Sequence, residues 1–158
     1  MDLLKISWEA TIKYCEQLAL KINESNYKPD MLVGLSRGGL VPVRIMSDVL
    51  GINEVGVLGL SFYTGMGKKL NEPKITQELA IDISGKKILL IDDVADSGRS
   101  LIAAKEYLLK KGAKEIKIAT IHYKPISLFK PDYFVQTTSA WIAYPWERHE
   151  IERELRKK

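Results

Sequence analysis

Residues 88–100 read ILLIDDVADSGRS, and the interpretation of the whole chain starts from this stretch. Its first four residues are all apolar, which is typical of a strand buried on both faces of a parallel sheet. The carboxylates of Asp92 and Asp93 follow, and burying them costs free energy unless cations or hydroxyl groups meet them. Residues 97–100 then open a helix, whose free N–H groups and positive dipole end favour an anion. We therefore expect a carboxylate pair beside a phosphate site.

This combination suits a sugar phosphate, because carboxylates can hold ribose hydroxyls while backbone amides hold a 5′-phosphate. Each part taken alone is more typical of a capped helix that follows a solvated acidic turn. The thirteen residues taken together favour the ligand site.

Outside this stretch, helical apolar patterns alternate with short, continuously apolar runs. This alternation predicts one α/β domain over residues 1–158, with a mostly parallel sheet covered by helices on both faces. The expected strands cover residues 31–33, 55–62, 87–91, 116–121 and 133–135. The expected helices are one capped by Ser7 with Trp8, Ile12, Cys15, Leu18 and Ile22 on its apolar face, one over residues 40–50 ended by Gly51, and one from Leu101 to Leu109 closed by Gly112.

Ligands of such sheets bind beyond the carboxyl ends of the strands, here after Leu35, Ile91 and Tyr123. The polar stretch Tyr63–Gln77 contains two glycines and a proline. A stretch of that length is either a lid over a binding site or a β-hairpin, and both interpretations stay open.

Composition excludes several classes of protein. The 158 residues are 46% hydrophobic and 28% charged, an ordinary globular balance without an apolar run long enough for a membrane span. The single cysteine, Cys15, excludes a disulfide-stapled fold, and with only two histidines a structural zinc site is not expected. The net charge of +4 is scattered, so a nucleic-acid partner is not expected. We expect a soluble cytoplasmic protein without a membrane partner.

Residues 88–100 resemble the 5-phosphoribosyl-1-pyrophosphate (PRPP) motif of type I phosphoribosyltransferases, with serines at 97 and 100 where that family usually has threonine. The resemblance implies the fold of that family, with a flexible lid loop and a small C-terminal hood. It assigns PRPP and phosphate binding to Asp92, Asp93, Val94, Ala95, Asp96, Ser97, Gly98, Arg99 and Ser100.

Two further segments are similar to 6-oxopurine members of this family. Residues 34–42, GLSRGGLVP, resemble the pyrophosphate loop of bacterial xanthine-guanine enzymes, which implies a cis peptide at Ser36-Arg37. The pyrophosphate-binding residues implied are Ser36, Arg37, Gly38 and Gly39. The sequence YKP at 123–125 and WIAYPW at 141–146 imply base binding: Lys124 donates to the 6-oxo group, Trp141 stacks on the base, and the backbone of Ile142 reads the far edge.

The resemblance also implies a metal ion, Mg²⁺, with Asp93 and Glu147 as its protein ligands. Arg153 lies six residues after Glu147, where related enzymes have an arginine that faces pyrophosphate. A solvated helix of mixed charge explains Glu147 and Arg153 equally well.

Taken together, the resemblance implies a Mg²⁺-dependent purine salvage transferase. It would use PRPP and guanine, hypoxanthine or xanthine, release GMP or IMP and pyrophosphate, and form a homodimer or homotetramer. Asp96 occupies the position of the catalytic general base. The alternative is a PRPP-sensing regulator that binds nucleic acid on the same fold. A dinucleotide-dependent oxidoreductase is disfavoured because no G-x-G-x-x-G follows a strand.

Overall fold

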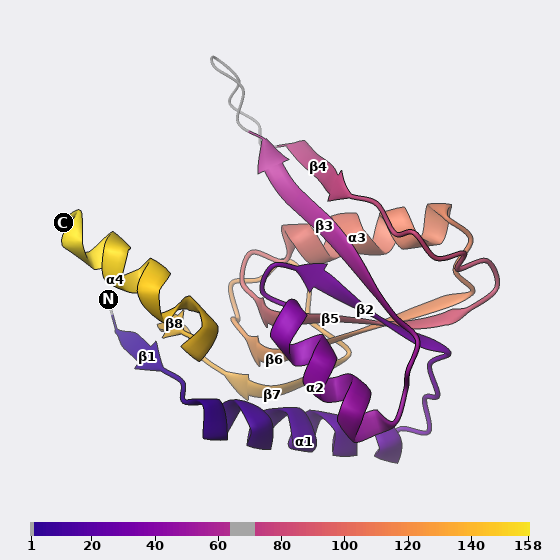
Figure 1. Ribbon diagram of the computed structural model, residues 1–158, viewed down its shortest axis with the longest axis horizontal. Coiled ribbons are helices and arrows are strands. Elements are labelled where there is room, and N and C mark those ends of the chain that lie inside the picture. The colour runs from indigo at the N-terminus through magenta and orange to yellow at the C-terminus, as the bar shows by residue number, and fades with distance from the viewer. Residues whose placement is uncertain (1, 64–71) are drawn as a thin grey trace.

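The structure, a computed structural model, describes residues 2–63 and 72–158 (Figure 1). Its helices and strands, in chain order, are β1 (Leu3–Lys5), α1 (Trp8–Glu24), β2 (Met31–Ser36), α2 (Leu40–Leu50), β3 (Val55–Tyr63), β4 (Glu72–Gln77), β5 (Lys87–Ala95), α3 (Arg99–Lys110), β6 (Glu115–Tyr123), β7 (Tyr133–Thr137), β8 (Trp141–Ala143), the 3-10 helix η1 (Pro145–Glu147) and α4 (Arg148–Arg156).

Six strands form one sheet in the order β4-β3-β2-β5-β6-β7, parallel except for the pair β3–β4. Side chains alternate between its faces. Val33 and Leu90 pack in the cluster that includes α3, whereas Leu32 packs with α1 and α2. The central strands are continuously apolar because helices cover both faces. The predicted α/β architecture is confirmed.

The helix ends follow local sequence. The Ser7 side chain accepts a hydrogen bond from the Ala10 N–H at 3.0 Å, and Gly51 ends α2 with a left-handed φ of 68°. The predicted apolar face of α1 is partly wrong. Trp8 and Ile12 are 52% and 45% exposed, because the buried stripe is rotated towards Thr11, Cys15, Leu18, Ala19 and Ile22.

Several strands run beyond their apolar runs. β5 continues to Ala95, because Asp92 and Val94 pair with Thr120 and His122 of β6. The acid pair therefore lies within the last part of the strand, whereas the sequence predicted it directly after the strand's last residue, Ile91.

Part of the expected lid, Glu72–Gln77, is a strand that pairs antiparallel with β3, as in the hairpin interpretation. Residues 64–71 of that lid lie outside the described residues.

The two ends of the chain form a separate small layer. β1 pairs parallel with β8, and α4 follows beside them (Figure 1). This layer is the hood that the family resemblance implies. Within residues 2–63 and 72–158, no helix has the length and apolar character to cross a membrane.

Candidate active site

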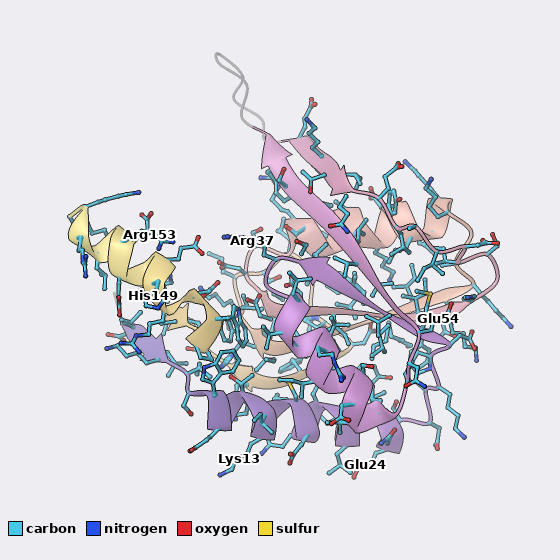
Figure 2. The ribbon with its side chains drawn as sticks, viewed as in Figure 1. Lys13, Glu24, Arg37, Glu54, His149 and Arg153 are labelled. Carbon is cyan, nitrogen blue, oxygen red and sulfur yellow. The ribbon has the colours of Figure 1, made fainter. Side chains whose placement is uncertain are left out.

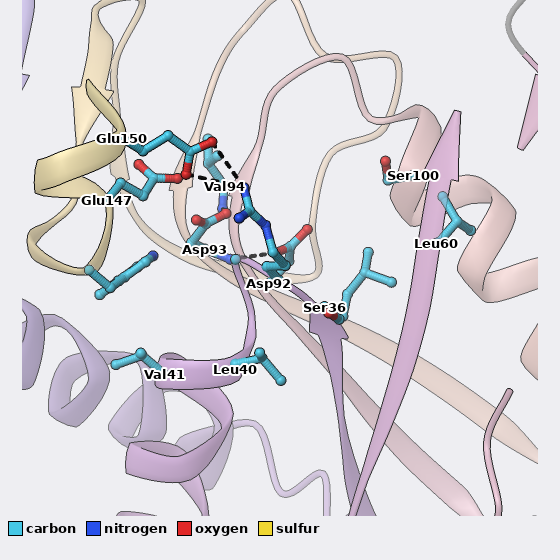
Figure 3. A pocket seen from close by; sticks show the side chains of 14 residues that line it. Ser36, Leu40, Val41, Leu60, Asp92, Asp93, Val94, Ser100, Glu147 and Glu150 are labelled. Atoms are coloured by element: carbon cyan, nitrogen blue, oxygen red, sulfur yellow. Dashed lines mark hydrogen bonds and ion pairs between the residues drawn. The ribbon is translucent and has the colours of Figure 1, made fainter. Parts of the chain in front are cut away.

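A cavity of about 510 Å³ lies at the carboxyl ends of β2 and β5 (Figure 3). The loop after β2 lines it from one side and residues 92–94 of β5 from another. Glu147 and Glu150, from η1 and α4, face the acid pair across it. Its position agrees with the rule for parallel sheets, and the cavity brings the predicted pyrophosphate loop and acid pair together.

The loop after β2 contains a cis peptide bond between Ser36 and Arg37, as the resemblance implied. The loop lies against β5 at Gly38, where a Cβ atom would be 2.5 Å from a carboxylate oxygen of Asp93. A side chain there would collide with the acid pair, so glycine permits the close approach of loop and strand.

Asp93 is buried and Asp92 is partly buried, and other acids lie near both. The Asp93 N–H donates to Asp92 at 2.9 Å, and the Val94 N–H donates to Asp93 at 2.7 Å. Burial and the nearby Glu147 carboxylate raise the pKa of Asp93 to about 7. Burial and the adjacent Asp93 raise the pKa of Asp92 well above its usual range. A cation in this cavity would relieve both effects.

A hydrogen-bond chain behind β5 holds the backbone of Asp93. The Tyr144 hydroxyl donates to the Asp93 carbonyl at 3.0 Å, and it lies 2.7 Å from Nδ1 of His122. Because that hydroxyl gives its proton to the carbonyl, His122 carries its own proton on Nδ1. Burial, then the nearby Lys124, lowers the pKa of His122 to about 4, so the imidazole is neutral. The sequence predicted only a core or strand residue here.

The start of α3 forms a smaller cavity of about 70 Å³, lined by Asp92, Val94, Asp96, Ser97, Gly98, Ser100 and Leu101. Gly98 adopts a left-handed φ of 83°, and a Cβ atom there would lie 2.5 Å from the Ser127 hydroxyl. Two predicted phosphate-binding residues, Arg99 and Ala95, do not line this cavity with their side chains. The Arg99 guanidinium lies 4.8 Å from the centre of the Phe62 ring, and the Ala95 side chain is buried in the core.

A third cavity, of about 460 Å³, is lined by Lys124, Ser139, Trp141, Glu154 and Lys158. It therefore unites the two side chains that the resemblance assigned to the base. Lys124 is only 14% exposed on its side chain, and its ammonium lies 3.4 Å from the carboxylate of Asp96. The Lys158 ammonium lies 5.8 Å from the centre of the Trp141 ring.

Ile142 is not among the residues that line this cavity. Its side chain packs with Ile6 and Tyr144. The Trp141 N–H donates to the carbonyl of Asp2 and the Ala143 carbonyl accepts from the N–H of Ile6, the residues on either side of β1. In a parallel ladder the residue between two bonded ones directs its N–H and C=O away from that neighbour, so those of Ile142 point away from β1.

Sequence reasoning missed Glu150, Ser139, Glu154 and Lys158. For Glu150 and Glu154 the available signal was their spacing of four residues, which places both on one side of α4. Arg153 is exposed on α4 and is not among the residues that line the cavity at the ends of β2 and β5.

Residues 7–150 match the model of the phosphoribosyl transferase domain. The chain is 30% identical to a xanthine-guanine phosphoribosyltransferase of Desulfotalea psychrophila, over 90% of this chain and 84% of the relative. A purine phosphoribosyltransferase from Pyrococcus horikoshii Ot3 has a similar structure, with a TM-score of 0.84 and 38% identity, covering 92% of this chain and 94% of that one. These relatives lend no support to the regulator alternative. The chain belongs to the phosphoribosyl transferase domain family.

Proposed function

We propose that this protein transfers the 5-phosphoribosyl group of PRPP to a 6-oxopurine, giving the nucleoside 5′-monophosphate and pyrophosphate. The observation that supports this most is the third cavity. Lys124 directly follows β6 and Trp141 begins β8, yet both line one pocket. Lys124 also touches Asp96, which belongs to the PRPP motif. The related enzymes are named for xanthine, guanine or purines, which supports the same substrate class.

Different segments of the chain would bind different parts of the substrates. The amides and hydroxyls of residues 97–100 would hold the 5′-phosphate, while Asp92 and Asp93 orient the ribose hydroxyls. The cis-peptide loop with Arg37 would bind pyrophosphate. As the bond at the anomeric carbon breaks, positive charge develops on the ribose, and Asp96 holds or takes the proton near N7 of the base.

Mg²⁺ fits the residues present. Asp93 and Glu147 offer carboxylate oxygens near each other, and the elevated pKa of Asp93 reflects a shortage of positive charge. No cluster of three or more metal-binding side chains occurs in the described parts of the chain. That suits Mg²⁺, which commonly binds through one or two carboxylates and substrate phosphates. When bound, it would neutralise charge on the departing pyrophosphate.

A panel of four bases with PRPP and Mg²⁺ tests this function. Guanine or hypoxanthine should exceed adenine by at least roughly two orders of magnitude in kcat/KM, since a lysine finds no acceptor on a 6-amino group. Including xanthine in the panel ranks the three 6-oxopurines as substrates. A reaction without Mg²⁺ tests whether the metal is required. Preference for adenine, or no turnover of any base, would overturn the proposal.

A further inference from the structure

The helix α4 contacts the pyrophosphate loop through one ion pair. A terminal guanidinium nitrogen of Arg37, Nη2, donates to both carboxylate oxygens of Glu150, at 3.0 and 3.1 Å (dashed lines in Figure 3). The two residues are 113 positions apart in the chain. Figure 2 shows Arg37 on the side of the sheet that faces α4.

The position of Glu150 next to Arg37 follows from the helical period of α4. The next residue, Ile151, is buried, and with Leu155 it lines the apolar groove beside β1. Successive helical residues point about 100° apart, so Glu150 leaves the apolar face and points towards the cavity. Glu147, three residues earlier, lines the same cavity. The contact with Arg37 thus follows from how α4 packs.

The charges of this cavity are unbalanced. Its described lining contains four carboxylates, from Asp92, Asp93, Glu147 and Glu150, but one guanidinium, that of Arg37. An anion that binds this guanidinium must displace the Glu150 carboxylate from its ion pair with Arg37. The pair is easily exchanged, because its side chains are 78% and 47% exposed and such pairs are weak.

We propose that Glu150 competes with pyrophosphate for Arg37, and so weakens the binding of the pyrophosphate group and speeds release of the pyrophosphate product. The inference rests on the proposed function, which places Arg37 in the pyrophosphate subsite. Before PRPP binds, Glu150 holds the guanidinium at the cavity. After the transfer, the Glu150 carboxylate forms the ion pair with Arg37 again and displaces pyrophosphate.

Titration calorimetry with inorganic pyrophosphate and Mg²⁺ tests the competition. Glu150→Gln should tighten pyrophosphate binding roughly two- to fivefold, the range expected when an exposed ion pair no longer competes. The KM for the base should stay within twofold of wild type. Glu152→Gln is the matched control, because Glu152 lies on the same helix and pairs with Arg148 at 3.1 Å. This control should leave pyrophosphate affinity unchanged.

The double variant separates the possible outcomes. In an Arg37→Ala background, Glu150→Gln should change the affinity by less than its effect in the wild type, because no guanidinium remains to compete for. Equal tightening in both backgrounds would mean that Glu150 acts only through its charge, and would overturn the competition. If Arg37→Ala weakens pyrophosphate binding but Glu150→Gln has no effect, only this inference fails. If Arg37→Ala also has no effect, the pyrophosphate role of Arg37 fails with it.

Discussion

Among single residues, Lys124 is the one whose chemistry discriminates most sharply between bases. Its ammonium is largely withdrawn from solvent and faces a cavity shared with Trp141. A charged donor gains about 1.5–3 kcal/mol from a hydrogen bond to a 6-oxo group. Adenine offers no such acceptor, so its binding would desolvate the ammonium without a hydrogen bond from the base in return.

We therefore expect Lys124→Met to lower kcat/KM for guanine and hypoxanthine by about 10- to 100-fold and to narrow the gap to adenine. Steady-state kinetics with the three bases measure this. Lys130→Met is a control, since the Lys130 ammonium lies over the ring of Phe134 instead. Trp141→Ala should weaken all bases alike, because stacking does not sense the 6-substituent. An unchanged preference in Lys124→Met would remove its role as reader of the 6-oxo group.

A second single-residue test concerns Asp96 as the general base. Its side chain is 67% exposed, so Asp96→Asn should fold normally while losing the proton acceptor. Turnover should fall by about 10²-fold or more, as is typical for loss of a general base, while binding of GMP persists. Single-turnover rates and calorimetry with GMP measure the two effects. Normal turnover near neutral pH would exclude Asp96 from this role.

At the scale of elements, the decisive contact is between the loop after β2 and strand β5. Residues 34–42 and 88–100 were each interpretable from local sequence, but their mutual approach was not. The structure places Gly38 against the Asp93 carboxylate, so the loop and the acid pair form one surface. This packing explains why a glycine, with no side chain, occupies the position.

Gly38→Ala should therefore disturb the site more than the fold. The added methyl group meets Asp93 and costs about 1–3 kcal/mol, a typical value for overpacking. We expect PRPP affinity to fall by roughly tenfold or more, with a smaller effect on affinity for the base alone. Calorimetry with each ligand compares them. Wild-type PRPP affinity in the variant would show that loop and strand separate without loss.

The strands illustrate why element bounds were harder to predict than element types. Alternation of apolar runs and helical patterns predicted the main strands and helices along the chain and a mostly parallel sheet. The ends of β5 and β6 were predicted too short, because the polar residues Asp92, Asp93 and His122 interrupt the apolar runs while the strands continue through backbone bonds to each other. Such pairing depends on the partner strand and leaves no apolar pattern.

For the whole molecule, the buried His122 makes stability depend on pH. The folded protein keeps His122 neutral down to about pH 4, whereas the unfolded chain takes up its proton near 6.5. The unfolded state therefore binds more protons between these values, and the free energy of unfolding falls as the pH falls from 6.5 to 4. Because His122 is 1% exposed, the loss attributable to it approaches about 3 kcal/mol.

Urea unfolding of wild type and His122→Asn, each at pH 7 and pH 4.5, measures this loss. Asparagine keeps a donor near the position of Nδ1, so the hydrogen bond to Tyr144 has a substitute. The variant should lose less stability between the two pH values than wild type. Equal losses in the two proteins would mean that His122 does not account for the acid sensitivity.

By itself, the sequence determined the α/β architecture, the acid pair at the end of a central strand and the helix opening at residues 97–100. Those features follow from neighbours a few residues apart, since strand alternation, helical period and capping are local. Only the tertiary structure decided that Tyr144 and His122 support Asp93 and that Glu150 pairs with Arg37. These contacts join residues up to 113 positions apart, and they depend on how β8 and α4 pack against the sheet. No local pattern encodes a distance between elements, so such contacts become visible only in the folded chain.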